Sequence, residues 1–470
     1  MSEKKIKINQ VVIDEKIYPR NTVNPKRVEL FSENLRDGFI FDTIEVEIHP
    51  DDKDKYRILD GAHRFKAFRA NGYTEIKVNI RNLDGYCPLL YSASKAIGPQ
   101  QLTEEEAKQT ARRAYFYDSS LKSVDIAKAV GRSRRTVDSY ISDLKAVNDL
   151  ELDTSIFRMK RLGIPSDRII DRLNIPQRTL TFRYSKIPEL IKPIMEDISK
   201  GFTVSQVADK YSYTEPMIWS IVLDGKDDIE RFKELQWGIQ TWDVWNYNKC
   251  DQRFGDDWPG RIPAQLVAHI LYFFSKQNDL VLDPMSGGGV TSDLCLALNR
   301  KCWSFDLTNR PKQRPEIEYH YWDPKNLIWP VKGRFKPDIV VFDPPYFRKK
   351  VNEYAEKSIS TLSKSKYLSF LKSFFILLHK HTKPECRIAF INADWRDYQN
   401  TPAFNENAQS GIFIDEYIDI CKQAGWQRTH IIHAPMSNNR FVAGEVSAMQ
   451  KKKSIGVISR YVIILKKYKT

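Results

Sequence analysis

The spacing of hydrophobic positions divides the 470-residue chain into three regions. Up to about residue 95, alternating stretches predict strands (TIEVEIHP, YRILDGAHR), and RVELFSENLRDG predicts a helix that ends at Gly38. From about 100 to 230, the hydrophobic positions have helical spacing. From about 235 onward, short apolar runs such as DLVLDP, CWSFDL and DIVVFDPP alternate with helical stretches. This alternation predicts an α/β fold with a doubly wound, mostly parallel sheet.

We therefore expect four segments: a small α+β domain over 1–95, a helix-turn-helix over 96–150, further helical units over 151–234, and the large α/β domain over 235–470. The net charge of +14 favours an anionic partner, with nucleic acid ahead of a membrane surface. No apolar run is long enough to span a membrane, and the N-terminus has no secretory pattern, which indicates a cytoplasmic protein. The six cysteines form no C-x-x-C pair, so we expect no metal site.

The first region has a glycine turn between a strand and a helix, in DGAHRFKAFRANG. With the flanking YPRNTVNPKRVELFSENLRDGFIFDTIEV and EIKVNI, it resembles the N-terminal domain of ParB-type partition proteins. In that superfamily a G-x-x-R turn handles nucleotide phosphates, and the resemblance puts Gly61, His63 and Arg64 there. The family's glutamate after the glycine is Ala62 here, which argues against nucleotide hydrolysis. A scaffold or dimerisation role is the alternative.

The middle region repeats one helical pattern three times, each typical of a helix-turn-helix whose second helix can enter a DNA major groove. The turns fall at Gly131, Asn174 and near Ser212. The first copy resembles the helix-turn-helix that follows the ParB N-terminal domain, and we expect it to bind double-stranded DNA. The basic residues at the start of its second helix are Arg132, Arg134 and Arg135. DNA binding is less favoured for the second copy, the third is expected only to pack, and a plain helical bundle is the alternative for all three.

Acidic residues follow the predicted strands of the last region, at the edge where ligands bind on parallel sheets. They are Asp283, Asp306, Asp323 and Asp343. After Asp283, the stretch PMSGGGVTSDL lets a ligand approach the backbone just before a helix N-terminus suited to an anionic group. Asp306 lies where a carboxylate can accept both hydroxyls of a ribose. Because the loop reads G-x-G-x-x-S, a dinucleotide site is disfavoured.

The stretch VVFDPPYFRKK ends a predicted strand with an acid, two prolines and a tyrosine. The prolines stiffen the turn and remove two backbone donors. Asp-Pro-Pro-Tyr after the glycine loop resembles the amino-methyltransferases that use S-adenosylmethionine to methylate exocyclic amines of nucleic-acid bases. The resemblance covers nearly all of residues 260–470. It implies a Rossmann-like methyltransferase domain with S-adenosyl-L-methionine as its cofactor.

The resemblance also assigns roles to individual residues. Those that would hold the cofactor are Asp283, Pro284, Gly287, Gly288 and Gly289 at its amino-acid part, Asp306 at its ribose and Asp323 at its adenine. Those that would be catalytic are Asp343, Pro344, Pro345 and Tyr346. An exocyclic amine is a poor nucleophile because its lone pair is delocalised into the ring. If Asp343 and the Pro344 carbonyl accept its hydrogens, the lone pair becomes available, while Tyr346 offers a stacking face to a flipped base.

The leading interpretation is a DNA methyltransferase. The resemblance favours adenine N6, because in that family an aspartate at the start of the motif is commoner in adenine-N6 enzymes. The alternatives are cytosine-N4 methylation of DNA, methylation of RNA, and a non-enzymatic ParB-like regulator. Two basic segments, 347–360 and 437–454, are candidate DNA-facing loops, and solvated loops are their alternative. A homodimer through the N-terminal or helix-turn-helix region, and a nucleoid location, complete the expectations.

Overall fold

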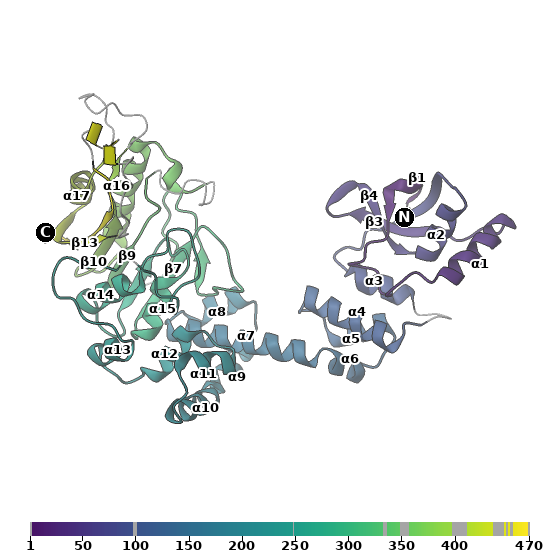
Figure 1. The fold of residues 1–470 in the computed structure, drawn as a ribbon, viewed down its shortest axis with the longest axis horizontal. Helices are drawn as coiled ribbons and strands as arrows, with labels where there is room; N and C mark the ends of the chain where they lie inside the picture. The colour runs from purple at the N-terminus through teal and green to yellow at the C-terminus, as the bar shows by residue number, and fades with distance from the viewer. Residues whose placement is uncertain are drawn as a thin grey trace. The chain divides into compact units, whose positions relative to one another are not determined.

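A computed structural model describes residues 2–96, 101–247, 249–331, 336–347, 357–396, 411–435, 446–447, 450–451 and 455–468. The chain divides into two compact units, Met1–Glu151 and Leu152–Thr470, and each is described by itself (Figure 1). The boundary falls within helix α7 (Ser142–Arg161). Most of the two basic segments proposed to face DNA lies outside the described residues.

The first unit begins with a mixed sheet of five strands in the order β1-β5-β3-β4-β2. Its elements are β1 (Ser2–Lys7), a 3₁₀ turn (Ile8–Gln10), β2 (Val11–Val12), α1 (Pro25–Arg36), β3 (Ile44–His49), β4 (Asp52–Asp60), α2 (Ala62–Ala70) and β5 (Glu75–Ile80). Alternate strand residues such as Val46, Ile58 and Val78 turn into one small core with Phe65 of α2. Asn24 starts α1 by accepting the Arg27 amide, as an N-cap should.

The rest of the first unit is a small helical cluster with its own core. Its helices are α3 (Pro88–Lys95), α4 (Glu104–Tyr117), α5 (Ser123–Val130) and α6 (Arg134–Tyr140). Thr103 and Glu106 form a reciprocal capping box at the start of α4. Gly131 ends α5 with a φ of +66°, a conformation that suits glycine, and Ser133 caps α6 two residues later. The chain therefore turns sharply between α5 and α6.

The second unit begins with helices that surround one side of a large sheet. They are α8 (Ser166–Leu173), α9 (Gln177–Ser185), α10 (Ile187–Ser199), α11 (Val204–Tyr211), α12 (Glu215–Val222) and α13 (Asp228–Glu234). The predicted turns are where α8 and α11 end: Asn174 and Ser212 have left-handed φ values of +50° and +55°. Most of α12 is buried, including Met217, Ile218 and Trp219, so the third helix pair packs against the domain.

The large sheet has seven strands in the order β13-β14-β10-β9-β6-β7-β8. The five strands from β10 to β8 are parallel, and β14 and β13 are added antiparallel at one edge. The strands are β6 (Leu280–Asp283), β7 (Lys301–Asp306), β8 (Ile317–Tyr319), β9 (Ile339–Phe342), β10 (Arg387–Asn392), β13 (Trp426–Pro435) and β14 (Ser459–Lys467). A separate hairpin pairs β11 (Trp395–Arg396) with β12 (Gly411–Ile412). The α/β class and the parallel-rich sheet predicted from the sequence are confirmed.

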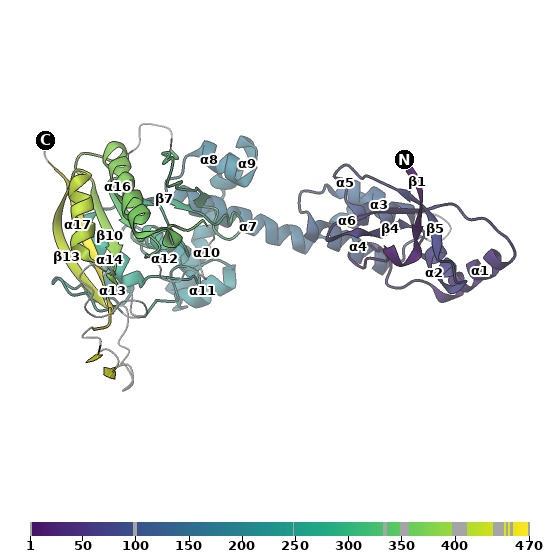
Figure 2. The ribbon, with the colours of Figure 1, turned by 90° about the horizontal axis from the view of Figure 1, so that it is seen from above.

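Helices cover both faces of this sheet (Figure 2). The remaining elements are α14 (Ala264–Phe274), α15 (Val290–Ala297), a 3₁₀ turn (Ile359–Thr361), α16 (Lys364–His381) and α17 (Ile414–Gln423). Along β9, Ile339 and Val341 join the core that contains α14 and α15, whereas Val340 and Phe342 join the core that contains α16 and α17. A strand buried on both faces must be apolar throughout, which is why IVVF shows no alternation.

Within the described residues, none of the helices combines the length and the hydropathy needed to cross a membrane.

Candidate active site

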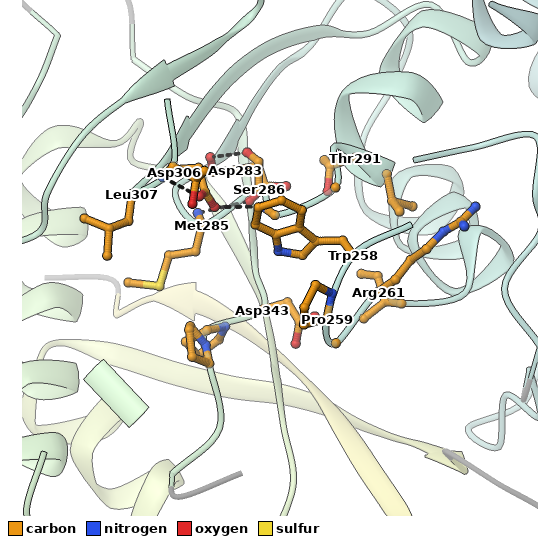
Figure 3. A pocket seen from close by; sticks show the side chains of 18 of the residues that line it. Trp258, Pro259, Arg261, Asp283, Met285, Ser286, Thr291, Asp306, Leu307 and Asp343 are labelled. Atoms are coloured by element: carbon orange, nitrogen blue, oxygen red, sulfur yellow. Dashed lines mark hydrogen bonds between the residues drawn. The ribbon is translucent and has the colours of Figure 1, made fainter. Parts of the chain in front are cut away.

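A cavity of about 910 Å³ opens at the carboxyl ends of β6, β7 and β9 (Figure 3). Three carboxylates predicted from separate parts of the sequence, Asp283, Asp306 and Asp343, line it together. The other predicted residues in its lining are Pro284, Gly287, Gly288, Pro344, Pro345 and Tyr346. The parallel arrangement explains this convergence, because neighbouring parallel strands end at the same edge of the sheet.

The residues after β9 are held by contacts with the protein on one side and line the cavity on the other. Phe347 is buried against Tyr367 and Trp395, and the Tyr367 hydroxyl donates to the Pro345 carbonyl at 3.2 Å. Of the two proline carbonyls, Pro345 is thus committed to the protein. The Asp343 carboxylate accepts a hydrogen bond from Tyr346. Its other oxygen, Oδ1, is buried without any partner among the described residues, so its acceptor capacity is unused at the wall of the cavity.

Burial raises the pKa of Asp343 to about 7, against the opposing effects of the Arg460 charge and the Tyr346 hydrogen bond. Burial likewise raises the pKa of Asp283 to about 7, although Thr291 and the Met285 amide donate hydrogen bonds to it. The charges of Asp343 and Asp306 add to this rise. A cation bound in the cavity would favour the ionised form of both carboxylates.

Asp306 is hydrogen-bonded to the glycine loop (residues 287–289). The Gly287 amide donates to Asp306 Oδ2 at 2.9 Å, and the Thr308 amide donates to Oδ1 at 2.8 Å. Each carboxylate oxygen keeps further acceptor capacity toward the cavity. Gly287 itself has a φ of +50°, and a Cβ there would lie 2.8 Å from Cδ1 of Trp258.

The glycines also make room for a loop of the protein itself. A Cβ on Gly288 would lie 2.8 Å from the Asp256 carbonyl oxygen and 2.9 Å from Trp258 Cβ. The Asp256 amide donates to the Gly288 carbonyl at 2.8 Å, which locks the two segments together. Sequence reasoning missed Trp258, although its neighbourhood, GDDWPG, has the composition of an ordered turn.

We expect Gly288→Ala to lower the free energy of unfolding by about 1–3 kcal/mol, because the added methyl group must displace backbone atoms. Chemical denaturation followed by circular dichroism measures this. Gly238→Ala is the matched control, since nothing lies within 4 Å of a Cβ at that position. Equal stability of the two variants would contradict the tight packing of the loop.

Two predicted cofactor residues lie apart from the cavity lining. Asp323 follows β8, and its Oδ1 caps a turn by accepting the Lys325 amide at 2.9 Å. Its neighbours Tyr321 and Trp322 line the cavity in its place. Gly289 is also absent from the lining, and a Cβ there would meet the Arg314 guanidinium at 3.0 Å. Gly289 starts α15, with a φ of +83°.

A buried network of charges supports the glycine loop from behind. Arg314 Nη1 lies 2.7 Å from Asp293 Oδ1, and its Nη2 lies 2.6 Å from Asp256 Oδ1. Arg158 of α7 contacts both Asp293 and Glu316. Burial opposes ionisation of Asp293, but the Arg314 and Arg158 charges outweigh it and lower its pKa to about 2. No local pattern in the sequence indicated these pairs.

Arg460 is a further cavity residue that the sequence did not single out. It is the second residue of β14, the strand antiparallel to β10. An antiparallel strand starts at the edge where its parallel neighbours end, so its first residues face the same ligand site. The direction of the last strand would have been the signal.

The three basic residues predicted to contact DNA differ in their surroundings. Arg132 is held inside its unit, since its Nε donates to Glu104 at 3.1 Å and its Nη2 to the Leu102 carbonyl at 2.8 Å. Arg134 is 75% exposed and lies 3.5 Å from Asp138, while Arg135 is exposed. Only the last two present their charge at the start of α6.

The second helix pair is anchored to the edge of the large sheet and leaves its second helix open. Arg168 lies 2.6 Å from Glu318 of the β8 strand, and Arg172 donates to the Pro315 carbonyl at 3.0 Å. Along α9, only Leu180 is buried. Exposed aromatic rings on α9 carry ammonium groups: Lys160 lies 5.3 Å from the Tyr184 ring centroid, and Lys186 lies 4.4 Å from that of Phe182.

A second cavity, of about 420 Å³, lies in the first unit beside the predicted phosphate turn. Gly61, His63 and Arg64 all line it. Arg64 Nη2 donates to Asp60 at 2.7 Å and Nη1 to the Asp42 carbonyl at 2.8 Å. Burial, together with nearby arginine charges, lowers the pKa of His63 to about 4, and its Nε2 accepts the Asn24 amide. The described residues contain no cluster of potential metal ligands.

Comparison with known families assigns the two regions separately. The model of the ParB N-terminal domain matches residues 2–87, and that of the DNA methylase family, N6/N4 type, matches residues 171–313. The chain is thus similar to the ParB N-terminal domain in one region and to the DNA methylase family in another. The methylase match includes the glycine loop and Asp306 but ends before Asp343. It therefore begins and ends earlier than the resemblance noted over 260–470.

Two curated relatives reflect the same division. The type II methyltransferase M2.LlaDCHI of Lactococcus lactis subsp. cremoris is 30% identical over 99 residues, 20% of this chain and 37% of the relative. A probable chromosome-partitioning protein ParB of Xylella fastidiosa (strain 9a5c) is 31% identical over 127 residues, 27% of this chain and 40% of the relative. The chain thus spans less than half of each. Among solved structures, TrmN from Thermus thermophilus aligns over 44% of this chain and 50% of its own, with 14% identity and a TM-score of 0.27.

Proposed function

We propose that this chain is a DNA methyltransferase that transfers a methyl group from S-adenosylmethionine to the exocyclic amine of a flipped base, with adenine N6 favoured. Its second unit would then be a doubly wound, Rossmann-like methyltransferase domain. The observation that carries the proposal is the buried Oδ1 of Asp343, which has no partner among the described residues and belongs to a residue that lines the cavity with Asp283 and the glycine loop. Such an acceptor calls for a donor from a ligand, and an exocyclic amine supplies one.

The cavity suits the cofactor in size and in charge. Its volume of about 910 Å³ falls in the range of small-molecule sites. The three carboxylates give it a negative potential that complements a sulfonium cation. When bound, S-adenosylmethionine supplies a methyl group that is already activated for transfer. Asp283, Pro284 and the loop from Gly287 to Gly289 would hold its amino-acid part, Asp306 its ribose, and the segment around Asp323 its adenine.

The chain's own residues prepare the amine. Asp343 Oδ1 and the Pro344 carbonyl would accept its two hydrogens, so that the nitrogen lone pair leaves the plane of the base. The prolines and the bond from Tyr367 to Pro345 fix this segment, so little reorganisation is needed. Tyr346 holds the Asp343 carboxylate through its hydroxyl, and its ring lines the cavity where an extruded base would lie.

The direct test is to incubate the purified chain with S-adenosylmethionine and duplex DNA and to identify modified nucleosides by mass spectrometry. N6-methyladenine supports the proposal as stated. N4-methylcytosine would change the base while keeping the mechanism, and methylation of structured RNA alone would change the substrate. No modified base with any nucleic acid would overturn the proposal and favour a non-enzymatic DNA-binding regulator.

We expect kcat/KM to rise with pH up to a plateau above about pH 7 and to fall about tenfold per pH unit below it. Asp343 must be ionised to accept an amine hydrogen strongly, and its pKa is raised to about 7. Because Asp283 titrates in the same range, the limb reports the pair of carboxylates. Initial rates at constant ionic strength measure it. A flat profile between pH 5 and 9 would contradict the role of Asp343.

The helix pair α5–α6 is our candidate for bringing the enzyme to DNA. Arg134 and Arg135 present exposed charge at the start of α6, whereas Arg132 is used inside the unit. Substrate DNA on the chromosome would place the protein in the cytoplasm at the nucleoid. On the second unit, the exposed aromatic and basic face of α9 is a further candidate for contact with nucleic acid.

We expect Arg135→Gln to weaken DNA binding and to reduce the slope of log affinity against log salt by about one unit, because one phosphate contact is lost. Fluorescence anisotropy with a labelled duplex at several salt concentrations measures both quantities. Lys128→Gln, an exposed cation on α5, is the matched control for the loss of one charge. Equal slopes for both variants would remove α6 as the DNA-contacting helix.

The phosphate turn in the first unit is proposed as a nucleotide-binding site, with a scaffold role as the alternative. Gly61, His63 and Arg64 line a cavity beside Arg20, Arg27 and Lys95. This gathering of cations supports an anionic ligand. Equilibrium dialysis with nucleoside triphosphates distinguishes the two roles.

A further inference from the structure

The cavity holds one buried cation whose role the proposed chemistry leaves open. Three cationic side chains from the described residues line it: Arg261, Lys357 and Arg460. Lys357 is exposed, and Arg261 donates to the carbonyls of Asp251 and Phe254 at 2.7 Å each. Arg460 is only 6% exposed. It is therefore the cation that has lost most of its water.

Nothing in the described part of the chain replaces that water. The Nε atom of Arg460 is buried without a hydrogen-bond partner. Its guanidinium takes part in none of the ion pairs that the described residues make. Within these residues it does not pair with Asp343 either, although its positive charge favours ionisation of that carboxyl group. Burying an N–H donor without an acceptor is costly. Within the described residues, no acceptor satisfies the Nε–H of Arg460.

Resting on the proposed function, we infer that Arg460 binds an anionic oxygen group of the methylation complex. Two groups in that complex have this chemistry: a phosphate beside the flipped nucleotide and the carboxylate of the cofactor. Both match the bidentate geometry of a guanidinium. Among the described residues, Asp343 has an unused acceptor and Arg460 an unused donor, and both residues line the same cavity, so one ligand could contact both of them.

An anion is favoured over a neutral acceptor because of the balance of charge. Asp283, Asp306 and Asp343 line the cavity together with Arg460. If the ligand offered Arg460 only neutral groups, the guanidinium would be attracted to the Asp343 carboxylate. Among the described residues the two do not form an ion pair, so neither charge is neutralised by direct contact with the other. An incoming oxyanion would pair with it and leave Asp343 for the amine.

The experiment compares Arg460→Met with Arg428→Met, the matched control that removes an exposed arginine from the adjacent strand β13. In the first arm, calorimetry measures binding of S-adenosylmethionine and of its decarboxylated form. The second arm uses a duplex that the enzyme methylates. Single phosphates flanking the target base are replaced by neutral methylphosphonates, and the Michaelis constant for each duplex is measured. Melting curves check the fold, and Arg460→Gln replaces the methionine variant if that variant does not fold.

A carboxylate contact predicts that wild type prefers the intact cofactor roughly 10- to 100-fold over the decarboxylated form and that the Arg460 variant loses this preference. A phosphate contact predicts that one methylphosphonate raises the Michaelis constant for DNA by a similar factor in wild type and has no effect in the variant. Unchanged preferences in both arms, with the Arg460 variant matching Arg428→Met, would overturn the inference. A wild type that binds no cofactor and methylates no duplex would instead overturn the proposed function.

Discussion

Replacing Asp343 by alanine should reduce methyl transfer by roughly 10³-fold while leaving cofactor affinity within about twofold of wild type. The carboxylate follows β9 and has a buried oxygen without a partner among the described residues, and alanine would leave the amine lone pair delocalised. Asp283 and the glycine loop, which would bind the cofactor, are not altered. Single-turnover rates with radiolabelled cofactor and calorimetric titration measure the two quantities separately.

Asp343→Asn sharpens this test, because it keeps the size of the side chain and removes the charge. Native Asp343 has a pKa of about 7 against an ordinary value of 3.8, so the native state binds more protons than the unfolded state between these values. Its contribution to stability therefore falls as pH rises through this window. We expect the asparagine variant to be inactive and to melt at a higher temperature than wild type at pH 8, with the difference shrinking toward pH 4.

Asp419→Asn, an exposed aspartate on α17, is the control for loss of a carboxylate and should change neither rate nor stability. An active Asp343→Ala variant would remove the proposed role of this residue. A variant that loses cofactor binding to the same extent as activity would assign Asp343 to cofactor binding, which also contradicts the mechanism.

The three aspartates of the cavity could be predicted, because the direction of the strands and the position of each residue along the chain are enough to bring them together. Apolar runs without alternation identify strands buried on both faces, and their parallel order brings the residues after them to one edge. Asp283, Asp306 and Asp343 each follow such a run, and all three line the cavity. The turn residues Gly131 and Asn174 could be placed for a similar reason, since left-handed helix ends are determined locally.

The rest of the site depends on contacts between distant segments. Arg460 faces the cavity only because β14 runs antiparallel, and Trp258 lies on the glycine loop because Asp256 binds Gly288. Neither relation leaves a pattern in the local sequence. Asp323 shows a different limit: it follows a strand as expected, but its Oδ1 accepts the Lys325 amide in a turn, and its role in binding the cofactor stays a prediction. Position along the chain does not determine which way a side chain points.

Removing Arg158 should produce the second large effect, a loss of about 3–5 kcal/mol in the free energy of unfolding of the second unit. Arg158 is buried on α7 with Asp293 and Glu316, and its Nη2 lies 2.7 Å from Glu316 Oε1. Methionine fills similar space but carries no charge. Of the two arginines that pair with the buried carboxylates of Asp293 and Glu316, only Arg314 then remains. Urea denaturation monitored by tryptophan fluorescence measures the change, and Arg178→Met, an exposed arginine on α9, is the control.

The double variant Arg158→Met with Glu316→Leu separates lost pairing from lost packing. It leaves Asp293 the only buried carboxylate beside Arg314 among the described ion pairs, at 2.7 Å, so we expect it to recover a substantial part of the stability lost by the single variant. In the single variant Asp293 loses one of the two charges that hold its pKa near 2. Because that pKa should rise toward its ordinary value of 3.8, acid unfolding should begin at a higher pH than in wild type. A double variant no more stable than Arg158→Met would show that the arginine acts through packing, and that α7 is not joined by charge to the segment behind the glycine loop.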